Sequence, residues 1–219
     1  LQAGTGSVLG AGVQAVGTLS GTGDLKVTTT DSMVAHGQNL AAGQATLQGA
    51  NADLTGSRTS ASGIAITATQ GTVTTSGAKV TTPGSLRIDA ASALVNAAGQ
   101  LQGGQLDVQA LNLANTQGGE IVQTGSGPAS FAVSNTLDNS AGRIASNGDL
   151  TITAASLRNA SGSIAVPGTS KLKADVTGTL DNREGQITVG GPLALKAQAL
   201  VNDAGRIAGN GEGTLATGR

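Results

Sequence analysis

Two aspartates of this chain have the residue type and spacing that could support hydrolysis. Asp138 and Asp181 each stand directly before an asparagine in the same local sequence, Leu-Asp-Asn, in two separate parts of the chain. A pair of carboxylates, one acting as general acid and the other as base or nucleophile, is the usual machinery for cleaving a glycosidic bond. Whether these two could cooperate depends on the elements that hold them.

Metal chemistry has less support in the sequence. His36 is the single histidine, it lies near Met33 in a polar stretch, and the chain has no cysteine. Because a structural zinc site usually takes four ligands, we expect an exposed histidine here and no metal site. Residues 209–213 read Gly-Asn-Gly-Glu-Gly, which lacks the Gly-Gly-x-Gly-x-Asp spacing of calcium-binding repeats. We therefore predict no metal, no cofactor and no catalytic residue.

Both aspartates belong to a cassette that recurs through the second half of the chain. Its pattern is Leu-x-Asn-x-x-Gly-x-Ile/Leu, and its asparagines recur at alternately shorter and longer intervals of ~20 residues. The copy at 113–121 is one residue longer. Such a fixed period indicates a solenoid, in which one small unit stacks on itself. The asparagines are Asn96, Asn115, Asn139, Asn159, Asn182 and Asn202, and the corner glycines are Gly99, Gly118, Gly142, Gly162, Gly185 and Gly205.

A second periodic signal lies between the cassettes. Pairs of apolar residues two positions apart recur at intervals of ~21 residues, and the residues around them are mostly polar. The pairs are Leu25/Val27, Ala45/Leu47, Ile64/Ile66, Leu86/Ile88, Leu106/Val108, Phe131/Val133, Leu150/Ile152, Leu172/Ala174 and Leu193/Leu195. The alternation within each pair indicates strands with one apolar and one wet face, and no stretch has the spacing of an amphipathic helix.

Together the two signals predict an all-β fold, a right-handed parallel β-helix of about ten coils with a period of ~21 residues. At about 4.8 Å per coil, the rod would be about 48 Å long. One coil cannot bury enough apolar surface to fold alone, so its stability has to come from its neighbours. Residues 1–85 follow the period with Gly/Ala/Thr-rich turns, whereas residues 86–219 carry the asparagine cassette. We expect one continuous solenoid in which residues 1–20 are the least regular part.

The stacked geometry gives each cassette residue an expected place. The asparagines would bond to their equivalents above and below and to turn main chain, and the glycines would supply a positive φ at the corner. Asn159 is also a formal glycosylation sequon, but a place in the column would make it inaccessible. Asp138 and Asp181 would lie two coils apart, about 10 Å, with Arg158 between them. We therefore favour a charge-balanced outer column over an active site.

Composition excludes several other classes of protein. The chain has 35 glycines, no tryptophan or tyrosine, and one phenylalanine, Phe131, so it cannot build a bulky globular core or an aromatic sugar platform. Disordered chains combine low hydrophobicity with high net charge, whereas this chain is 38% hydrophobic with a net charge of −1. The same near-neutrality argues against nucleic acid or an anionic membrane surface as the main partner.

The strand and corner sequences resemble those of a known family. Residues 147–154, Asn-Gly-Asp-Leu-Thr-Ile-Thr-Ala, with the neighbouring cassettes, resemble the haemagglutinin repeats of filamentous haemagglutinin-like exoproteins, including the contact-dependent growth inhibition exoproteins. The resemblance covers roughly residues 25–217. It implies export through an outer-membrane partner by two-partner secretion and a long β-helical filament on the bacterial surface. The missing cysteines suit such export, because closed loops would obstruct passage through a pore.

The resemblance implies a structural shaft segment that is not an enzyme and projects a distal adhesin or toxin module. No signal peptide or membrane-spanning segment is recognisable, and repeats run to both ends, so we expect an internal fragment with adjoining coils on either side. The alternative is a directly adhesive β-helix that binds a host glycan or a target-cell surface, with the threonines of 28–30 and 67–82 as a hydroxyl face. A polysaccharide-cleaving β-helix is the third possibility.

Overall fold

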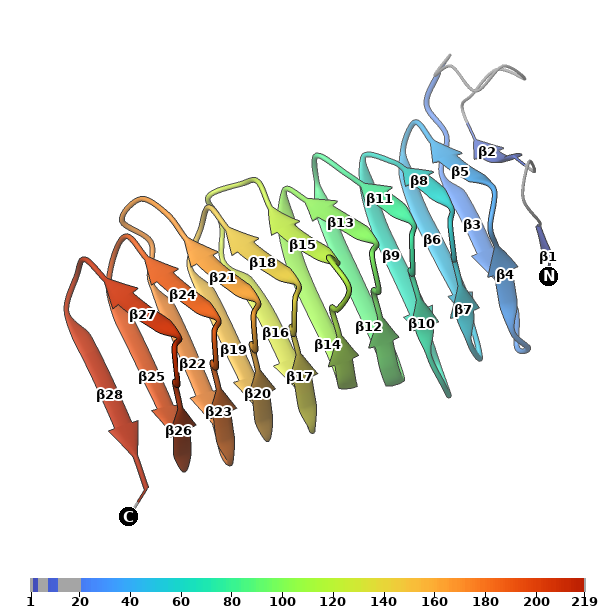
Figure 1. Cartoon of the computed structure of the whole chain (residues 1–219). Helices are drawn as coiled ribbons and strands as arrows, with labels where there is room; N and C mark the ends of the chain where they lie inside the picture. Colours follow the sequence, from blue (N-terminus) through green and yellow to red (C-terminus); the bar gives the residue numbers. More distant parts are fainter. Residues whose placement is uncertain (1, 4–7, 12–20, 219) are drawn as a thin grey trace.

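The computed structural model describes residues 2–3, 8–11 and 21–218, which form a rod of stacked β coils (Figure 1). In this part of the chain every element is a strand, and strands β1 (Gln2–Ala3) and β28 (Gly213–Thr217) lie at opposite ends of the rod. The sequence prediction for residues 1–20 lies mostly outside the described residues.

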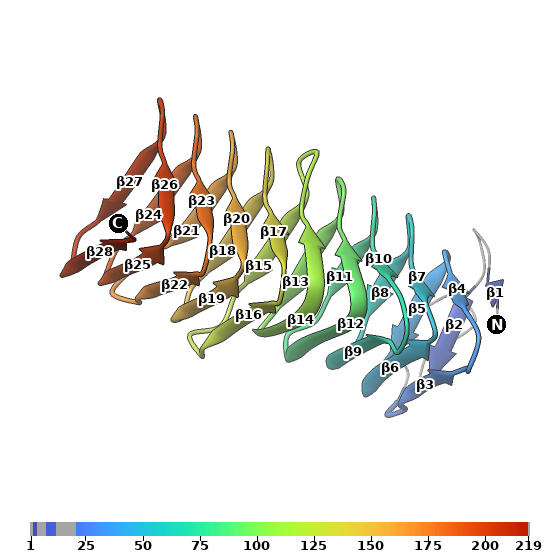
Figure 2. The ribbon, with the colours of Figure 1, turned by 90° about the horizontal axis from the view of Figure 1, so that it is seen from below.

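Each coil has three sides, and strands stack into one sheet face along each side (Figure 2). The first face holds β3 (Leu25–Thr28), β6 (Gln44–Gly49), β9 (Gly63–Ala68), the first part of β12 (Ser85–Val95) and of β14 (Gln105–Ala114), β16 (Ala129–Val133), β19 (Leu150–Ala154), β22 (Leu172–Val176), β25 (Leu193–Ala197) and β28. The second face holds β1, β4 (Met33–Ala35), β7 (Ala52–Asp53), β10 (Val73–Thr74), the last part of β12 and β14, β17 (Thr136–Asp138), β20 (Ser156–Arg158), β23 (Thr179–Asp181) and β26 (Ala199–Val201). The third face holds β2 (Val8–Ala11), β5 (Gln38–Ala41), β8 (Arg58–Ser60), β11 (Lys79–Thr81), β13 (Gln100–Gly103), β15 (Glu120–Gln123), β18 (Arg143–Ser146), β21 (Ser163–Val166), β24 (Gln186–Val189) and β27 (Arg206–Gly209).

All strand pairs that join these coils are parallel, and each strand pairs with its equivalents one coil above and one coil below. The coils from β3 to β27 are complete, and they are nine in number, with parts of a coil at either end. The predicted all-β parallel β-helix and its repeat length of ~21 residues are therefore confirmed, with about nine turns in place of ten.

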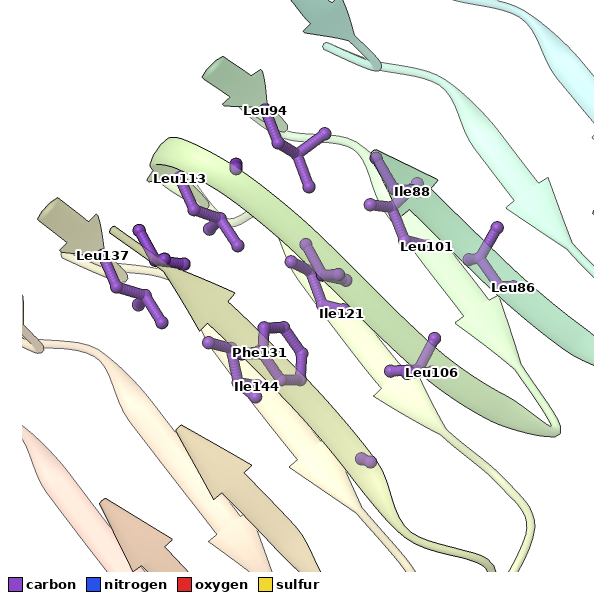
Figure 3. Close-up of a cluster of buried hydrophobic side chains, with 14 of the residues drawn as sticks. Leu86, Ile88, Leu94, Leu101, Leu106, Leu113, Ile121, Phe131, Leu137 and Ile144 are labelled. Atoms are coloured by element: carbon purple, nitrogen blue, oxygen red, sulfur yellow. The ribbon is translucent and has the colours of Figure 1, made fainter. Parts of the chain in front are cut away.

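The core is a set of apolar columns that run along the rod axis. On the first face Ile88 pairs with Val108, Val108 with Phe131 and Phe131 with Ile152, and all four side chains are buried. On the third face the inward column is Leu101, Ile121, Ile144, Ile164 and Ile187. Side chains from the three faces meet inside each coil and on top of those in the next coil (Figure 3). Burial therefore requires a neighbouring coil, as expected for a solenoid.

Candidate functional site

The strongest polar feature of the rod is the corner between the second and third faces. The second-face strands place their last inward residue at this corner, and in the C-terminal coils that residue is the cassette asparagine. The structure brings Asn96, Asn115, Asn139, Asn159, Asn182 and Asn202 into one column. In each consecutive pair, the Nδ2 of one asparagine donates to the Oδ1 of the next over 2.7 Å. The first five asparagines are fully buried.

The environment of Asn139 shows how such an amide is satisfied. Its Nδ2 donates to Oδ1 of Asn159 and is also 3.3 Å from the carbonyl oxygen of Gly142 in its own turn and 3.1 Å from that of Ser163 in the next coil. Its Oδ1 accepts from Asn115. A buried amide whose donor and acceptor are both paired adds stability and fixes one register between coils. We propose that the column has this role.

At most corners the glycine does not carry the positive φ that the sequence predicts. The positive φ lies one residue earlier, at Ala98, Gln117, Ala141, Ser161, Glu184 and Ala204, with values between 52° and 55°. Gly142 itself is needed for space, because a Cβ there would come within 3.0 Å of the main-chain oxygen of Asn115 in the preceding coil. The glycines at 99, 162, 185 and 205 meet the corresponding carbonyl in the same way. The sequence shows that glycine is required but cannot separate these two reasons.

In the longer cassette, the close contact with the carbonyl of the preceding coil moves by one residue. Gly118 has a positive φ of 79°, follows Gln117 in the same conformation, and has open space where a Cβ would stand. Gly119 is the residue that packs against the main-chain oxygen of Asn96. Gly118 is thus the one predicted corner glycine that has the expected positive φ, and the other five do not have it. The extra residue of this cassette is absorbed at Gly118, and Gly119 takes the crowded position.

Thr75 begins the column, whereas the sequence suggested only a place on the surface hydroxyl face of residues 67–82, which its full burial contradicts. It occupies the position of the asparagine one coil earlier, is fully buried, and its Oγ1 donates to Oδ1 of Asn96 over 2.9 Å. In the two coils before it, the same position is held by Leu54 and Ala35. Counting back one repeat length from Asn96 would have found Thr75, although its hydroxyl breaks the cassette pattern.

The two candidate aspartates do not meet. Register across the second face places Asp138 beside Arg158 and Arg158 beside Asp181, so the carboxylates are separated by one coil that carries a guanidinium. Asp181 instead pairs with Arg183, whose Nη2 lies 2.6 Å from Oδ2. Hydrogen bonding from Arg183 lowers the pKa of Asp181, which disfavours the protonated form that a general acid needs. The arrangement is the outer charged column.

His36 lies at the N-terminal end of the same corner. Its Nε2 is 3.0 Å from Oδ2 of Asp53, and both side chains are partly exposed. Burial raises the pKa of Asp53. Hydrogen bonds from the hydroxyl and amide of Thr55, together with His36, lower this pKa by a larger amount, so it lies below its ordinary value. This carboxylate is thus held in its charged form by its neighbours.

Acidification should therefore weaken the rod through Asp53. A carboxyl whose pKa is lower in the folded state contributes stability above its unfolded pKa, about 4, and this contribution is lost as the pH falls through the folded pKa. We expect Asp53→Asn, which keeps the acceptor for Thr55, to flatten the loss of stability below pH ~4. Urea unfolding at pH 7, 4 and 3 measures this; identical pH dependence in both proteins would contradict it.

The remaining surface is shallow. Two hollows on the described residues have volumes of about 480 Å³ on the third face, where Arg143 and Arg206 flank small residues, and about 510 Å³ beside Asp181 on the second face. The described residues include no group of three or more His, Cys, Asp or Glu placed to hold a metal ion. Within those residues there is also no helix with the length and apolarity to cross a membrane.

The threonines considered as a hydroxyl face do not line up from coil to coil at Thr67. Thr67 has Gln48 and Asp89 as its register neighbours, so the threonines form no continuous row there.

Geometry thus defines the class of protein as a parallel β-solenoid whose polar residues are organised around stacking. Comparison with known proteins gives the family. The haemagglutinin repeat family matches residues 2–78, 66–141, 124–183 and 165–219, so the chain belongs to that family. Filamentous haemagglutinin-like proteins of this kind are secreted proteins of the bacterial surface.

Among characterised proteins, the chain is similar to "Toxin CdiA" of Yersinia pestis. The two are 56% identical over 43 residues, which is 20% of this chain and 1% of that protein. The matched length is that of two coils, and the chain spans only a small part of that relative. No solved structure matches the chain.

Proposed function

We propose that this chain is a length of the shaft of a secreted bacterial surface filament, and that it serves to hold a distal adhesive or toxic module away from the cell. The carrying observation is that nine complete coils stack without interruption and that the buried cassette asparagines hydrogen-bond from one coil to the next. Membership of the haemagglutinin repeat family supports this role, as does the short match to a toxin that is far longer than the matched region.

Export would use an outer-membrane secretion partner, with the chain crossing unfolded and coiling outside. The physical support is that each coil depends on its neighbour for burial and that no cysteine can close a loop in advance. Adjoining coils of the parent polypeptide would then continue the columns at both ends of this segment.

A shaft should tolerate changes in length that keep its register. Deleting residues 139–181 removes two coils and joins Asp138 to Asn182, which restores an intact Leu-Asp-Asn cassette. We expect the parent exoprotein with this deletion to be secreted and to keep the activity of its distal module. Deleting residues 139–170 instead breaks the register and should abolish folding of the segment, which provides the matched control.

The second candidate is direct adhesion through the third face. The observation that favours it is the hollow beside Arg143 and Arg206, neither of which has an acidic partner within 4.0 Å in the described residues. Binding of the 219-residue chain to target cells, lost on Arg143→Ser/Arg206→Ser, would establish that role in place of the shaft. Loss of distal activity in the two-coil deletion, despite normal secretion, would also count against a shaft.

A further inference from the structure

We infer that the rod consists of two cooperative units that meet where Thr75 contacts Asn96, and that the N-terminal unit, residues 25–84, opens before residues 85–209. The inference rests on how the two units distribute polar groups inside the coils. It concerns stability, and it does not depend on what the filament carries.

In the C-terminal unit the corner column is polar, and the inward column of the third face that starts at Leu101 is apolar. The corner column is a chain of paired amides, and the inward column of the third face is Leu or Ile throughout. Pairing along the main chain is also extensive at the start of this unit, because β12 and β14 match at nine positions on both sides of a bulge. Every coil is thus held to the next by backbone, amide and apolar contacts together.

In the first two coils of the N-terminal unit these positions are exchanged. Ala35 and Leu54 occupy the corner column, so it offers no side-chain hydrogen bonds there, whereas Asn39 and Thr59 occupy the third-face column where Leu101 stands further along. Between these coils the corner column therefore supplies no side-chain hydrogen bond, and the side-chain bond from Asn39 to Thr59 lies on the third face instead.

Asn39 is the weak point of this unit. It is fully buried, and its Nδ2 donates to the carbonyl oxygen of Ala35 and to Oγ1 of Thr59, but its Oδ1 has no hydrogen-bond partner among the residues that the structure describes. Oγ1 of Thr59 also lies 3.3 Å from Oγ of the buried Ser57, so the same hydroxyl serves both residues. A buried acceptor without a donor has lost its hydrogen bonds to water and gains none in the protein. It therefore lowers the free energy needed to open this unit.

Thr75 joins the two units through one hydroxyl. It satisfies Oδ1 of Asn96, which lets the amide column start without an orphan acceptor, and it faces the apolar Leu54 on its other side. If the segment serves as a shaft, a point that rests on the proposed function, its N-terminal coils unfold before the others.

Native-state hydrogen exchange on the 219-residue chain, read by mass spectrometry, tests the inference. Main-chain amides of residues 25–60 should exchange at least about tenfold faster than those of residues 150–189. A repaired variant, Asn39→Leu/Ser57→Ala/Thr59→Val, installs the residue types found at Leu101, Ala78 and Val80. It should slow exchange in residues 25–60 by about tenfold and leave residues 150–189 unchanged.

Two comparisons keep the test decisive. The single change Asn39→Leu should give part of the slowing if the triple variant folds poorly, and Thr46→Val on the outer side of β6 should give none. Fraying of chain ends alone would loosen residues 172–209 as much as residues 25–60 and would not respond to the repair. Uniform exchange from residue 25 to residue 209, or a repaired variant without slowing, would overturn the inference. Neither result would bear on whether the segment is a shaft.

Discussion

Gly142→Ala should lower the free energy of unfolding by about 3 kcal/mol. The new Cβ would lie within 3.0 Å of the main-chain oxygen of Asn115 and close to the amides of Asn115 and Asn139. The oxygen belongs to the preceding coil, so relief of the clash requires the two coils to separate locally. Because the chain has no tryptophan or tyrosine, urea unfolding is best followed by far-ultraviolet circular dichroism.

The neighbouring position supplies the control. Ala141 has a φ of 52°, a conformation that costs a residue with a Cβ about 1–2 kcal/mol. We expect Ala141→Gly to be neutral or to stabilise by up to ~1 kcal/mol, opposite in sign to Gly142→Ala. Equal destabilisation by both changes would show that the corner is simply intolerant of substitution and that the contact with the preceding coil is not the cause.

Asn159→Ala is expected to destabilise the rod by about 1–3 kcal/mol. The substitution removes the acceptor of Nδ2 of Asn139 and the donor to Oδ1 of Asn182, and it leaves that buried oxygen without its partner from the column. The cavity would be small and lined with polar groups. Urea unfolding measures the change, and a variant as stable as the parent would remove the amide column from the account of stability.

Coupling along the column gives a sharper version of the same test. Asn139 and Asn159 share one hydrogen bond, so the loss in the double variant Asn139→Ala/Asn159→Ala should be smaller than the sum of the two single losses. Asn210→Ala is the matched control, because Asn210 is exposed outside the column, and it should change stability by less than about 0.5 kcal/mol. Strict additivity in the double variant would contradict coupling through the column.

The architecture was predictable because two independent periods agree. Apolar pairs such as Leu150 and Ile152 mark the first-face strand, and the cassette asparagines mark the corner, so the repeat length and parallel stacking follow from spacing alone. The register then carries Asp138, Arg158 and Asp181 into one outer column, as the repeat length requires. The number of complete coils was one too high because the chain includes parts of coils at both ends.

Other features depend on geometry that spacing does not encode. A glycine at a turn can be required by φ or by close contact, and only coordinates show that Gly142 is required by contact while Ala141 carries the positive φ. Thr75 shares the asparagine's position without its chemistry, so a motif search passes over it. Asn39 is an ordinary loop residue by type, yet it lies inside an apolar column. Thr75 and Asn39 were not predicted because the residue type at each position differs from that of most residues in the same column of the stack.

The central physical claim is that buried side-chain amides bond from coil to coil, and hydrogen exchange of those amides observed by NMR tests it most directly. The NH₂ groups of the asparagines from Asn96 to Asn182 donate to the next coil and are buried, so they should exchange about as slowly as the main-chain amides of the flanking strands. The NH₂ group of the exposed Asn210 should exchange at the rate of a free amide. Rapid exchange at the column asparagines, within a rod whose main chain stays protected, would contradict the account.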